Sequence, residues 1–373
     1  MAERRKTLVA DKILLLTALT LALFGILMQY SASSYIAFNQ TGDAFYYVKK
    51  QAVALVVALV AAFAASRIRF EILKKFSLAL LVVSAVLLAL VFVPGLGVEK
   101  YGATRWLNLG FTTFQPSELA KFALMIFIAS NLSERSSARF RDMIGILLAT
   151  LAICALVMLE PNMSITICIG ICVLLMLYIG GCGLKQFAVM AIPVVVAIPL
   201  LILAEPYRLK RLLAFVDPWA SPLGEGYQLI QSYYALGSGG WFGLGLFNSR
   251  QNYIFLPFDE RAFIFAVLGA ELGLIGCIFV IALFCVIIWR AVVIASKAVN
   301  RFQTSVAAGV GIVISVQTLL NIAVVSGSIP PTGLPMPFIS SGGSSLVVFA
   351  AAVGLLEGIA RNSQIRRSFH KMY

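Results

Sequence analysis

Charged residues are scarce in this chain of 373 residues, of which 12% are Asp, Glu, Lys or Arg and 61% are hydrophobic. A soluble domain needs a polar exterior, so this scarcity of charge excludes a single soluble core. His370 is the one histidine, which excludes the His-based metal motifs of proteases, nucleases and deaminases. The composition indicates a polytopic membrane protein.

Paired cysteine motifs are also missing from the sequence. The six cysteines lie within or at the ends of hydrophobic stretches, without CxxC spacing: Cys154, Cys168, Cys172, Cys182, Cys277 and Cys285. We interpret them as small buried apolar residues rather than as metal ligands or disulfides. The sequence implies no cofactor, and it leaves a requirement for a divalent cation open.

Long hydrophobic runs dominate what is present. Windows of roughly 20 apolar residues predict an all-α fold of about ten transmembrane helices. The predicted spans are 12–34, 50–66, 76–94, 115–132, 143–160, 163–180, 184–204, 263–290, 304–328 and 338–361. The first run has no persuasive small-residue cleavage site after it, so we expect it to remain as the first helix rather than act as a signal peptide.

The excess of basic residues, a formal net charge of +13, is spread in short groups between these runs. A scattered distribution favours membrane orientation over nucleic-acid binding, and placing both termini in the cytoplasm puts most basic groups on inner loops. We therefore expect one integral-membrane domain over 1–373. It would carry an extracytoplasmic loop at 205–262, between the seventh and eighth spans, and a basic cytoplasmic tail at 362–373.

The predicted outer loop keeps several cations against the orientation rule, namely Arg208, Lys210, Arg211, Arg250 and Arg261. Such cations indicate either an anionic ligand or contact with the membrane surface, and the sequence leaves both interpretations open. Long loops in compact proteins are more often functional than idle.

The sequence FQPSELAKF places two charges inside the fourth predicted span. Glu118 and Lys121 are three residues apart, so both project from one helix face and can pair. Left unpaired in hydrocarbon, either charge costs about 3 kcal/mol. The pair is either a structural ion pair between spans or part of a polar cavity wall, and Arg105 and Trp106 just upstream favour the cavity.

Two glycine-rich stretches interrupt the apolar pattern. GSGGWFGLG at 237–245 lacks the GxGxxG spacing of a phosphate loop, and SSGGSS occupies 340–345. We interpret both as re-entrant turns in which glycine lets backbone approach backbone or a ligand. They indicate a cavity opening on the outer face, although simple packing of small residues explains them equally well.

A series of sequence blocks resembles one family along nearly the whole chain. The blocks are YSASS at 30–34, GATRWLNLG at 102–110, FQPSELAK at 114–121, YRLKR at 207–211, FVDPW at 215–219, GEGYQLIQSYYALGSGG at 224–240, NSRQNYIFLP at 248–257, FIFAVLGAELG at 263–273 and PPTGLPMPFISSGGSSL at 330–346. In this order they resemble the SEDS family of shape, elongation, division and sporulation proteins. The YSASS, FQPSELAK and NSRQ blocks look closer to its FtsW and sporulation branch than to its RodA branch.

The resemblance implies a peptidoglycan glycosyltransferase of the bacterial cytoplasmic membrane, which polymerises lipid II beside a class B penicillin-binding transpeptidase and other divisome or elongasome proteins. In such an enzyme the sugar hydroxyl of one lipid II attacks the anomeric carbon of another chain, and undecaprenyl pyrophosphate departs. Arg105, Arg208, Arg211 and Lys121 would hold the diphosphate or a lipid headgroup, Glu118 would orient Lys121, and Trp106 would stack on a sugar. The remaining candidate substrate-binding residues are Gln115, Ser117 and Ser344.

The sequence departs from the family pattern where chemistry is expected. The family has Pro, four residues and then an Asp as the candidate base, and the same count from Pro257 reaches Ala262. Asn162 stands where the family has a second acid, Ser341 where it has Tyr, and Phe247 where it often has Gly. An alanine methyl group cannot accept a proton, so the base has to lie elsewhere or be absent.

Three hypotheses follow from this departure. In the first, the chain remains a polymerase whose base is Glu260 or Asp259, two or three residues before Ala262. In the second, it is a weak or inactive homologue that serves as a scaffold for lipid II or the transpeptidase. In the third, it is a transporter of lipid-linked precursor, for which the sequence shows no internal repeat.

Overall fold

The computed structural model describes residues 11–100, 102–110, 112–134, 140–203, 205–248 and 263–370. Its long helices are α1 (Lys12–Thr41), α2 (Tyr46–Ser66), α4 (Ser77–Leu90), α5 (Pro116–Ser133), α6 (Phe140–Leu159), α7 (Met163–Ile179), α8 (Leu184–Leu203), α12 (Ile264–Lys297), α13 (Arg301–Val325) and α14 (Gly343–His370). Each corresponds to one predicted span, so the helical membrane fold is confirmed. The last predicted span began at 338, whereas α14 begins at Gly343 because the residues before it fold back into the bundle.

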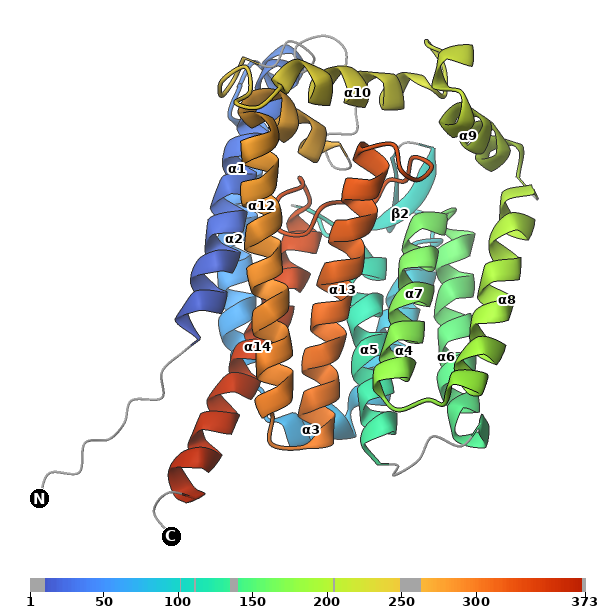
Figure 1. The fold of residues 1–373 in the computed structure, drawn as a ribbon, viewed down its shortest axis with the longest axis vertical. Helices are drawn as coiled ribbons and strands as arrows, with labels where there is room; N and C mark the ends of the chain where they lie inside the picture. Colours follow the sequence, from blue (N-terminus) through green and yellow to red (C-terminus); the bar gives the residue numbers. More distant parts are fainter. Residues whose placement is uncertain are drawn as a thin grey trace, which may run out of the picture.

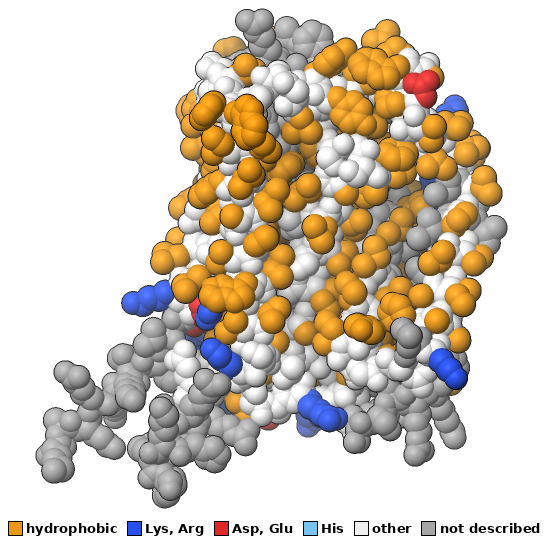
Figure 2. Space-filling model, in the orientation of Figure 1, with side chains coloured by type: hydrophobic (Ala, Val, Ile, Leu, Met, Phe, Trp, Pro, Cys, Tyr) orange, Lys and Arg blue, Asp and Glu red, His pale blue; other side chains and the backbone are white. Residues whose placement is uncertain are grey.

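The long helices run roughly side by side and form one bundle (Figure 1). By length and composition, α1, α2, α12, α13 and residues 343–364 of α14 can cross a membrane. Their outward side chains include exposed apolar residues such as Val60, Phe63 and Val292. Hydrophobic side chains cover the visible face, whereas most visible Lys and Arg lie near its lower end (Figure 2). This surface suits surrounding lipid rather than water.

The two ends of the bundle differ. The start of α1 and the end of α14 lie at one end, which we call the tail end (Figure 1). The opposite end, which we call the loop end, carries α9 (Pro206–Val216), the short helix η1 (Pro218–Ala220) and α10 (Tyr227–Gly239). The predicted outer loop is therefore largely helical in its described part, and α10 lies across the bundle. The remaining short helix, α3 (Phe70–Lys75), precedes α4.

A small antiparallel sheet precedes α5. Its strands β1 (Gly97–Lys100), β2 (Ala103–Asn108) and β3 (Thr113–Phe114) pair in the order β1, β2, β3. Leu107 of β2 pairs with Gly97 on one side and with Phe114 on the other. The sheet was not predicted, and its effect is to fix the residues that lead into α5.

At the tail end, Asp11 connects three helices. Its carboxylate accepts a hydrogen bond from the amide of Leu14, which caps α1, and forms an ion pair with Arg290 of α12. Its own backbone N–H donates to both carboxylate oxygens of Glu357 in α14, at 3.2 and 3.0 Å. We call this group of residues the tail clasp.

Candidate functional site

The two charges of α5 form a buried ion pair, as predicted. Pro116 occupies the first turn of α5, where its missing N–H is not needed. Glu118 is 0% exposed and Lys121 is 1% exposed, and Lys121 Nζ lies 3.1 Å from Glu118 Oε2. Lys121 Nζ also donates a hydrogen bond to Gln317 Oε1 of α13. A buried charge is tolerated only with such partners.

The segment between α13 and α14 folds into the bundle beside this pair. Gln317 Nε2 donates to the carbonyl of Pro335 at 2.8 Å, and Asn321 Nδ2 donates to the carbonyl of Leu334 at 2.7 Å. The amide of Met336 donates to Ser340 Oγ at 2.7 Å. These bonds satisfy backbone groups that would otherwise be stranded in an apolar interior. The predicted turn SSGGSS overlaps only the end of this segment, at 340–342, and its last three residues begin α14.

Several buried polar atoms on the same helices lack a hydrogen-bond partner within the described part of the chain. They are Ser117 Oγ of α5, Thr318 Oγ1 of α13 and Ser345 Oγ of α14. Buried polar atoms are nearly always satisfied by protein or water. Buried hydroxyl groups therefore accompany the ion pair on the same three helices.

Arg105 and Trp106 lie on β2. The Arg105 guanidinium donates from Nε to the carbonyl of Glu160 at 3.0 Å and from Nη2 to the carbonyl of Pro161 at 2.7 Å. Trp106 is 6% exposed, so its ring is covered in this conformation. Arg105 thus connects the sheet to the turn after α6, and a sugar or diphosphate contact by Arg105 or Trp106 stays a prediction.

The turn after α6 holds a buried acid. Glu160 is 0% exposed, and burial raises the pKa of its carboxyl to about 8 although the nearby charge of Arg105 lowers it. Asn162 accepts a hydrogen bond from the amide of Ile165 and caps α7, and its place in the family pattern stays a prediction. Asn and Asp are equally good N-cap residues, so an acid at this position would cap α7 as well.

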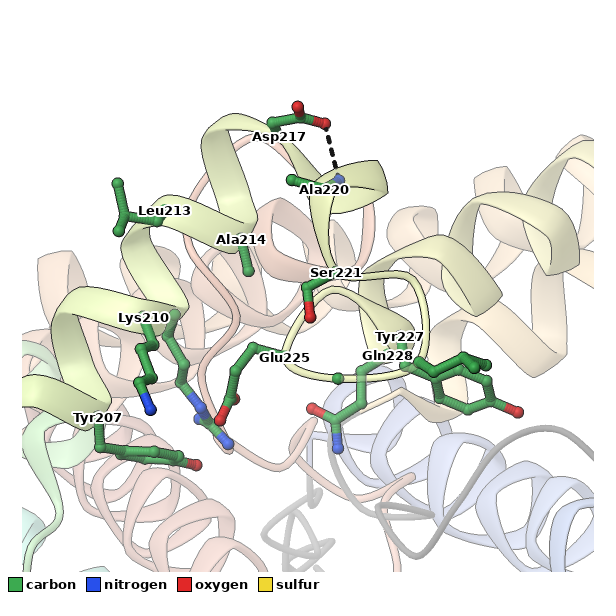
Figure 3. Close-up of a pocket in the computed structure, with 13 residues that line it drawn as sticks. Tyr207, Lys210, Leu213, Ala214, Asp217, Ala220, Ser221, Glu225, Tyr227 and Gln228 are labelled. Atoms are coloured by element: carbon green, nitrogen blue, oxygen red, sulfur yellow. Dashed lines mark hydrogen bonds between the residues drawn. The ribbon is translucent and has the colours of Figure 1, made fainter.

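A pocket of about 730 Å³ lies at the loop end, between α9 and the start of α10. Tyr207, Lys210, Glu225 and Gln228 all point into the same open space (Figure 3). Arg211 also lines the pocket, with its guanidinium carbon 4.7 Å from the centre of the Tyr207 ring. The pocket therefore combines cations, a carboxylate, an amide and an aromatic face, which can bind a polar, partly anionic ligand.

Sequence reasoning selected Arg211 and noted Lys210 among the loop cations, but it missed Tyr207, Glu225 and Gln228 in this pocket. Tyr207, Lys210, Arg211 and Ala214 are spaced i, i+3, i+4 and i+7, which places them on one face of α9. That helical spacing could have indicated a shared face, but the segment was predicted to be a loop and the spacing was not considered. Arg208 also lies on α9 and is half-buried.

The remaining candidates fall in different places. Gln115 is the N-cap residue of α5, Ser117 is 0% exposed, and Ser344 is half-buried in the first turn of α14. α14 lies beside both α5 and β3, so the elements that carry these candidates are neighbours in the bundle. The structure thus gathers the candidates into two groups, one inside the bundle and one in the pocket.

The candidate bases Asp259 and Glu260 lie outside the described residues, as do Ala262, Arg250 and Arg261. The description resumes at Phe263, directly before α12. Within the described residues, no group of three or more His, Cys, Asp or Glu side chains could hold a metal ion. The roles of Asp259 and Glu260 as candidate bases therefore remain predictions.

Comparison with known proteins identifies a family whose sequences this chain resembles. A model of cell cycle proteins that covers FtsW, RodA and SpoVE matches residues 11–365. Stage V sporulation protein E of Bacillus subtilis (strain 168) is 37% identical over 361 residues, which cover 95% of this chain and 98% of that protein. A probable peptidoglycan glycosyltransferase FtsW of Aliivibrio salmonicida (strain LFI1238) is 38% identical, with coverage of 93% and 88%.

Solved structures of related proteins have the same fold as this chain. A chain from a peptidoglycan synthase complex that coordinates polymerization and crosslinking has a TM-score of 0.80 and 28% identity, and the match covers 95% of this chain and 98% of that one. The rod shape determining protein RodA of Thermus thermophilus has the same fold, with a TM-score of 0.71, 24% identity and coverage of 95% and 97%. The chain is therefore a member of the FtsW/RodA/SpoVE family of cell cycle proteins.

Proposed function

We propose that this protein is a peptidoglycan glycosyltransferase that polymerises lipid II. The observation that carries the proposal is the cationic, partly aromatic pocket at the loop end of a membrane bundle. Relatives over nearly the whole chain are named probable peptidoglycan glycosyltransferases, which supports the same activity. A lipid-linked substrate needs its tail in the bilayer and its charged head at the membrane boundary. The apolar surface of the bundle suits the tail, and the pocket at the loop end suits the head.

The reaction joins two lipid-linked saccharides. A sugar hydroxyl of one lipid II forms a bond to the anomeric carbon of the other chain, while the bond from that carbon to the diphosphate oxygen breaks. The hydroxyl proton passes to a carboxylate, for which Glu260 or Asp259 is the candidate, and undecaprenyl pyrophosphate leaves with its negative charge. Arg208 and Arg211 would stabilise that charge, as cations do for departing phosphates.

The interior pair has a different role in this proposal. Lys121 is too deeply buried to contact a ligand in this conformation. Through Gln317 it connects α5 to the segment 330–342, which places a polar wall beside α5. Lys121 would reach a diphosphate only if that wall opened.

The working environment follows from the same proposal. The protein would lie in the bacterial cytoplasmic membrane with both termini inside, so that the pocket faces outward. A class B penicillin-binding protein would be its partner, in line with the synthase complex to which the chain is similar. The proposal requires no cofactor and leaves the effect of a divalent cation to be measured.

A polymerisation assay tests the proposal. Purified protein with its transpeptidase partner and labelled lipid II should yield glycan chains, and Glu260→Gln or Asp259→Asn should abolish them if that residue is the base. Polymer only after Ala262→Asp would instead support the scaffold hypothesis, which the alanine at this position favours. Precursor movement across vesicles without polymer would support transport.

The diphosphate assignment needs its own variant. Removing both cations of α9, by Arg208→Ala with Arg211→Ala, should lower the polymerisation rate by at least about 100-fold if they stabilise the leaving group. Lys185→Ala is the matched control, because Lys185 is an exposed cation at the other end of α8. Full activity in the double variant would refute the assignment.

A further inference from the structure

The pocket at the loop end has two walls of opposite charge. Lys210 and Arg211 line it from α9, and Glu225 lines it from the turn that leads into α10. The side chains of Lys210 and Glu225 point into the space between the two walls (Figure 3). A carboxylate in a site for a purely anionic group would weaken binding, because like charges repel each other. Glu225 therefore indicates a ligand that carries a positive group as well as a negative one.

The turn that carries Glu225 has a well-defined backbone. The amides of Gly224 and Gly226 donate to the carbonyl of Ser221, at 3.2 and 3.3 Å. A Cβ atom at Gly226 would come closer than 3.0 Å to the carbonyl oxygen of Pro218, so the turn also packs tightly against η1. This backbone holds the half-buried side chain of Glu225 at one place on the pocket wall.

Asp217 also lines the pocket, but its carboxylate is already engaged. It accepts hydrogen bonds from the amides of Trp219 and Ala220, at 3.1 and 3.3 Å, and so caps η1. Within the described part of the chain, the Glu225 carboxylate forms no hydrogen bond or ion pair, although two cations line the same pocket. Glu225 is therefore available to a ligand, whereas Asp217 serves the fold.

The surroundings of Glu225 suit a peptide. Gln228 follows three residues later, and its side chain points into the same space (Figure 3). A glutamine amide can donate to a peptide carbonyl and accept from a peptide N–H at the same time. The volume of about 730 Å³ lies within the range of about 300–1,000 Å³ that is typical of pockets for whole small molecules. Such a pocket has room for a second polar group beside a diphosphate.

Lipid II carries groups of both signs, since its peptide contains a diamino acid with an ammonium group. We propose that Glu225 and Gln228 form a peptide subsite of the pocket. Glu225 accepts hydrogen bonds from this ammonium group and Gln228 bonds to the peptide backbone, while the cations of α9 hold an anionic group of the same molecule. This inference rests on the proposed function, because it takes lipid II as the ligand. It makes Glu225 a residue that selects the substrate by its peptide.

Two forms of lipid II test the subsite, one with lysine as the diamino acid and one in which the lysine amine is acetylated. The full chain is reconstituted with its transpeptidase partner in phosphatidylglycerol nanodiscs, and crosslinking is blocked by a β-lactam. The unmodified chain should polymerise the free-amine form with a KM about tenfold lower, as a hydrogen bond to a charged group would cause. The two kcat values should be equal, because a contact remote from the reacting atoms acts equally in the ground and transition states.

Glu225→Gln should raise the KM of the free-amine form about tenfold and change that of the acetylated form by less than about twofold. Gln228→Ala should raise both KM values to the same extent, because the peptide backbone is common to both forms. Glu205→Gln is the matched control, since Glu205 is an exposed residue directly before α9 that makes no capping bond and lies outside the pocket lining. It should keep the preference. A missing preference in the unmodified chain, or one retained in Glu225→Gln, would overturn the inference.

Peptide binding supplies a readout that does not require polymerisation. The probes are the free lysine-containing pentapeptide of lipid II, labelled with a fluorophore at its N-terminus, and a copy with an acetylated lysine. The unmodified chain should bind the free-amine peptide about tenfold more tightly, and Glu225→Gln should remove the difference.

The two readouts separate this inference from the proposed function. A chain that makes no polymer but shows the Glu225-dependent peptide preference would refute the polymerase function and retain the subsite. A chain that makes polymer but binds both peptides equally would refute the subsite and retain the polymerase function. Displacement of the peptide by added phosphatidylethanolamine, if it requires Glu225, would assign the subsite to a membrane headgroup and overturn the inference.

Discussion

Lys121 shows how one residue can constrain a whole interior. Its ammonium group has Glu118 as a counter-ion, Gln317 as an acceptor and the Phe349 ring at 5.6 Å. These partners come from three helices, so the charge aligns α5, α13 and α14. A buried ion pair adds little net stability compared with apolar residues, but losing one member leaves an uncompensated charge.

Lys121→Met should therefore destabilise the protein by about 3–5 kcal/mol, because Glu118 would stay buried without its cation. The double variant Glu118→Gln with Lys121→Met should recover at least half of that loss. Thermal unfolding in detergent measures both. A double variant as unstable as the single one would contradict the explanation, because the loss would then not come from the unpaired carboxylate.

Glu160 predicts a dependence of stability on pH. Its pKa is raised by burial from 4.5 to about 8, so the folded state keeps the proton over a range in which the unfolded state loses it. This contribution is complete below pH 4.5 and is lost as the pH rises toward 8. At 1.36 kcal/mol per pKa unit, the full loss amounts to about 5 kcal/mol.

Glu160→Gln should remove this dependence, since an amide does not titrate. Unfolding temperatures measured between pH 5 and pH 8 should fall less steeply in the variant than in the unmodified protein. Equal slopes for the two proteins would show that the Glu160 carboxyl does not titrate in this range.

For single residues, the sequence predicts side-chain contacts between residues close in the chain and misses contacts between residues far apart in it. Glu118 and Lys121 are three residues apart, and helical geometry alone predicts their contact. Gln317 is 196 residues from Lys121, and the carbonyls that bind Arg105 are 55 and 56 residues away. Which long-range partner a side chain meets depends on how the helices pack, and a single sequence does not contain that information.

Among the helices, α2 and α14 pack closely against each other. Gly354 and Gly358 lie four residues apart on α14, and a Cβ at Gly354 would come closer than 3.0 Å to the carbonyl oxygen of Ala62. A Cβ at Gly358 would lie 3.0 Å from the carbonyl oxygen of Ser66. This spacing of small residues is typical of tightly packed membrane helices, whose association depends on close van der Waals contact.

Gly354→Ala should separate α14 from α2 and lower the stability by about 1–3 kcal/mol through overpacking. Gly145→Ala in α6 is the matched control, because a Cβ there meets nothing within 4 Å. The control should be neutral or slightly stabilising, since alanine favours a helix. Thermal unfolding of the two variants in the same detergent tests the difference, and equal effects would contradict it.

The sequence predicted the long helices but missed the short strands and the two helices α9 and α10. Long apolar runs predicted all the long helices, because burial in lipid requires about 20 consecutive apolar residues. The strands of 97–114 are two to six residues long, too short to show a clear alternation. α9 and α10 were missed because a helix at a boundary has mixed composition, which resembles a loop when only hydropathy is considered.

The molecule as a whole has two chemically different ends. The pocket and α10 lie at the loop end, and the tail clasp lies at the other. If the proposed orientation is correct, Ser221 in the pocket faces outward and Ser296 near the end of α12 faces the cytoplasm. Both side chains are exposed, so each can carry a reporter.

Ser221→Cys should react with a membrane-impermeant maleimide in intact spheroplasts, and Ser296→Cys should react only after permeabilisation. The unmodified chain serves as the control, because Cys154, Cys168, Cys172, Cys182 and Cys277 are at least partly buried and Cys285 lies within the span of α12. The reverse labelling pattern would mean that the pocket faces the cytoplasm, and the proposed polymerisation outside the cell would then fail.

The tail clasp has a consequence for the order in which the protein assembles. Asp11 is at the beginning of the first helix, but its partners Arg290 and Glu357 are 279 and 346 residues later. Synthesis proceeds from the N-terminus, so α1 enters the membrane long before either partner exists. The tail end of α1 acquires its final contacts only when α14 has been inserted, which makes closure of the clasp a late step in biogenesis and a marker of a completed bundle.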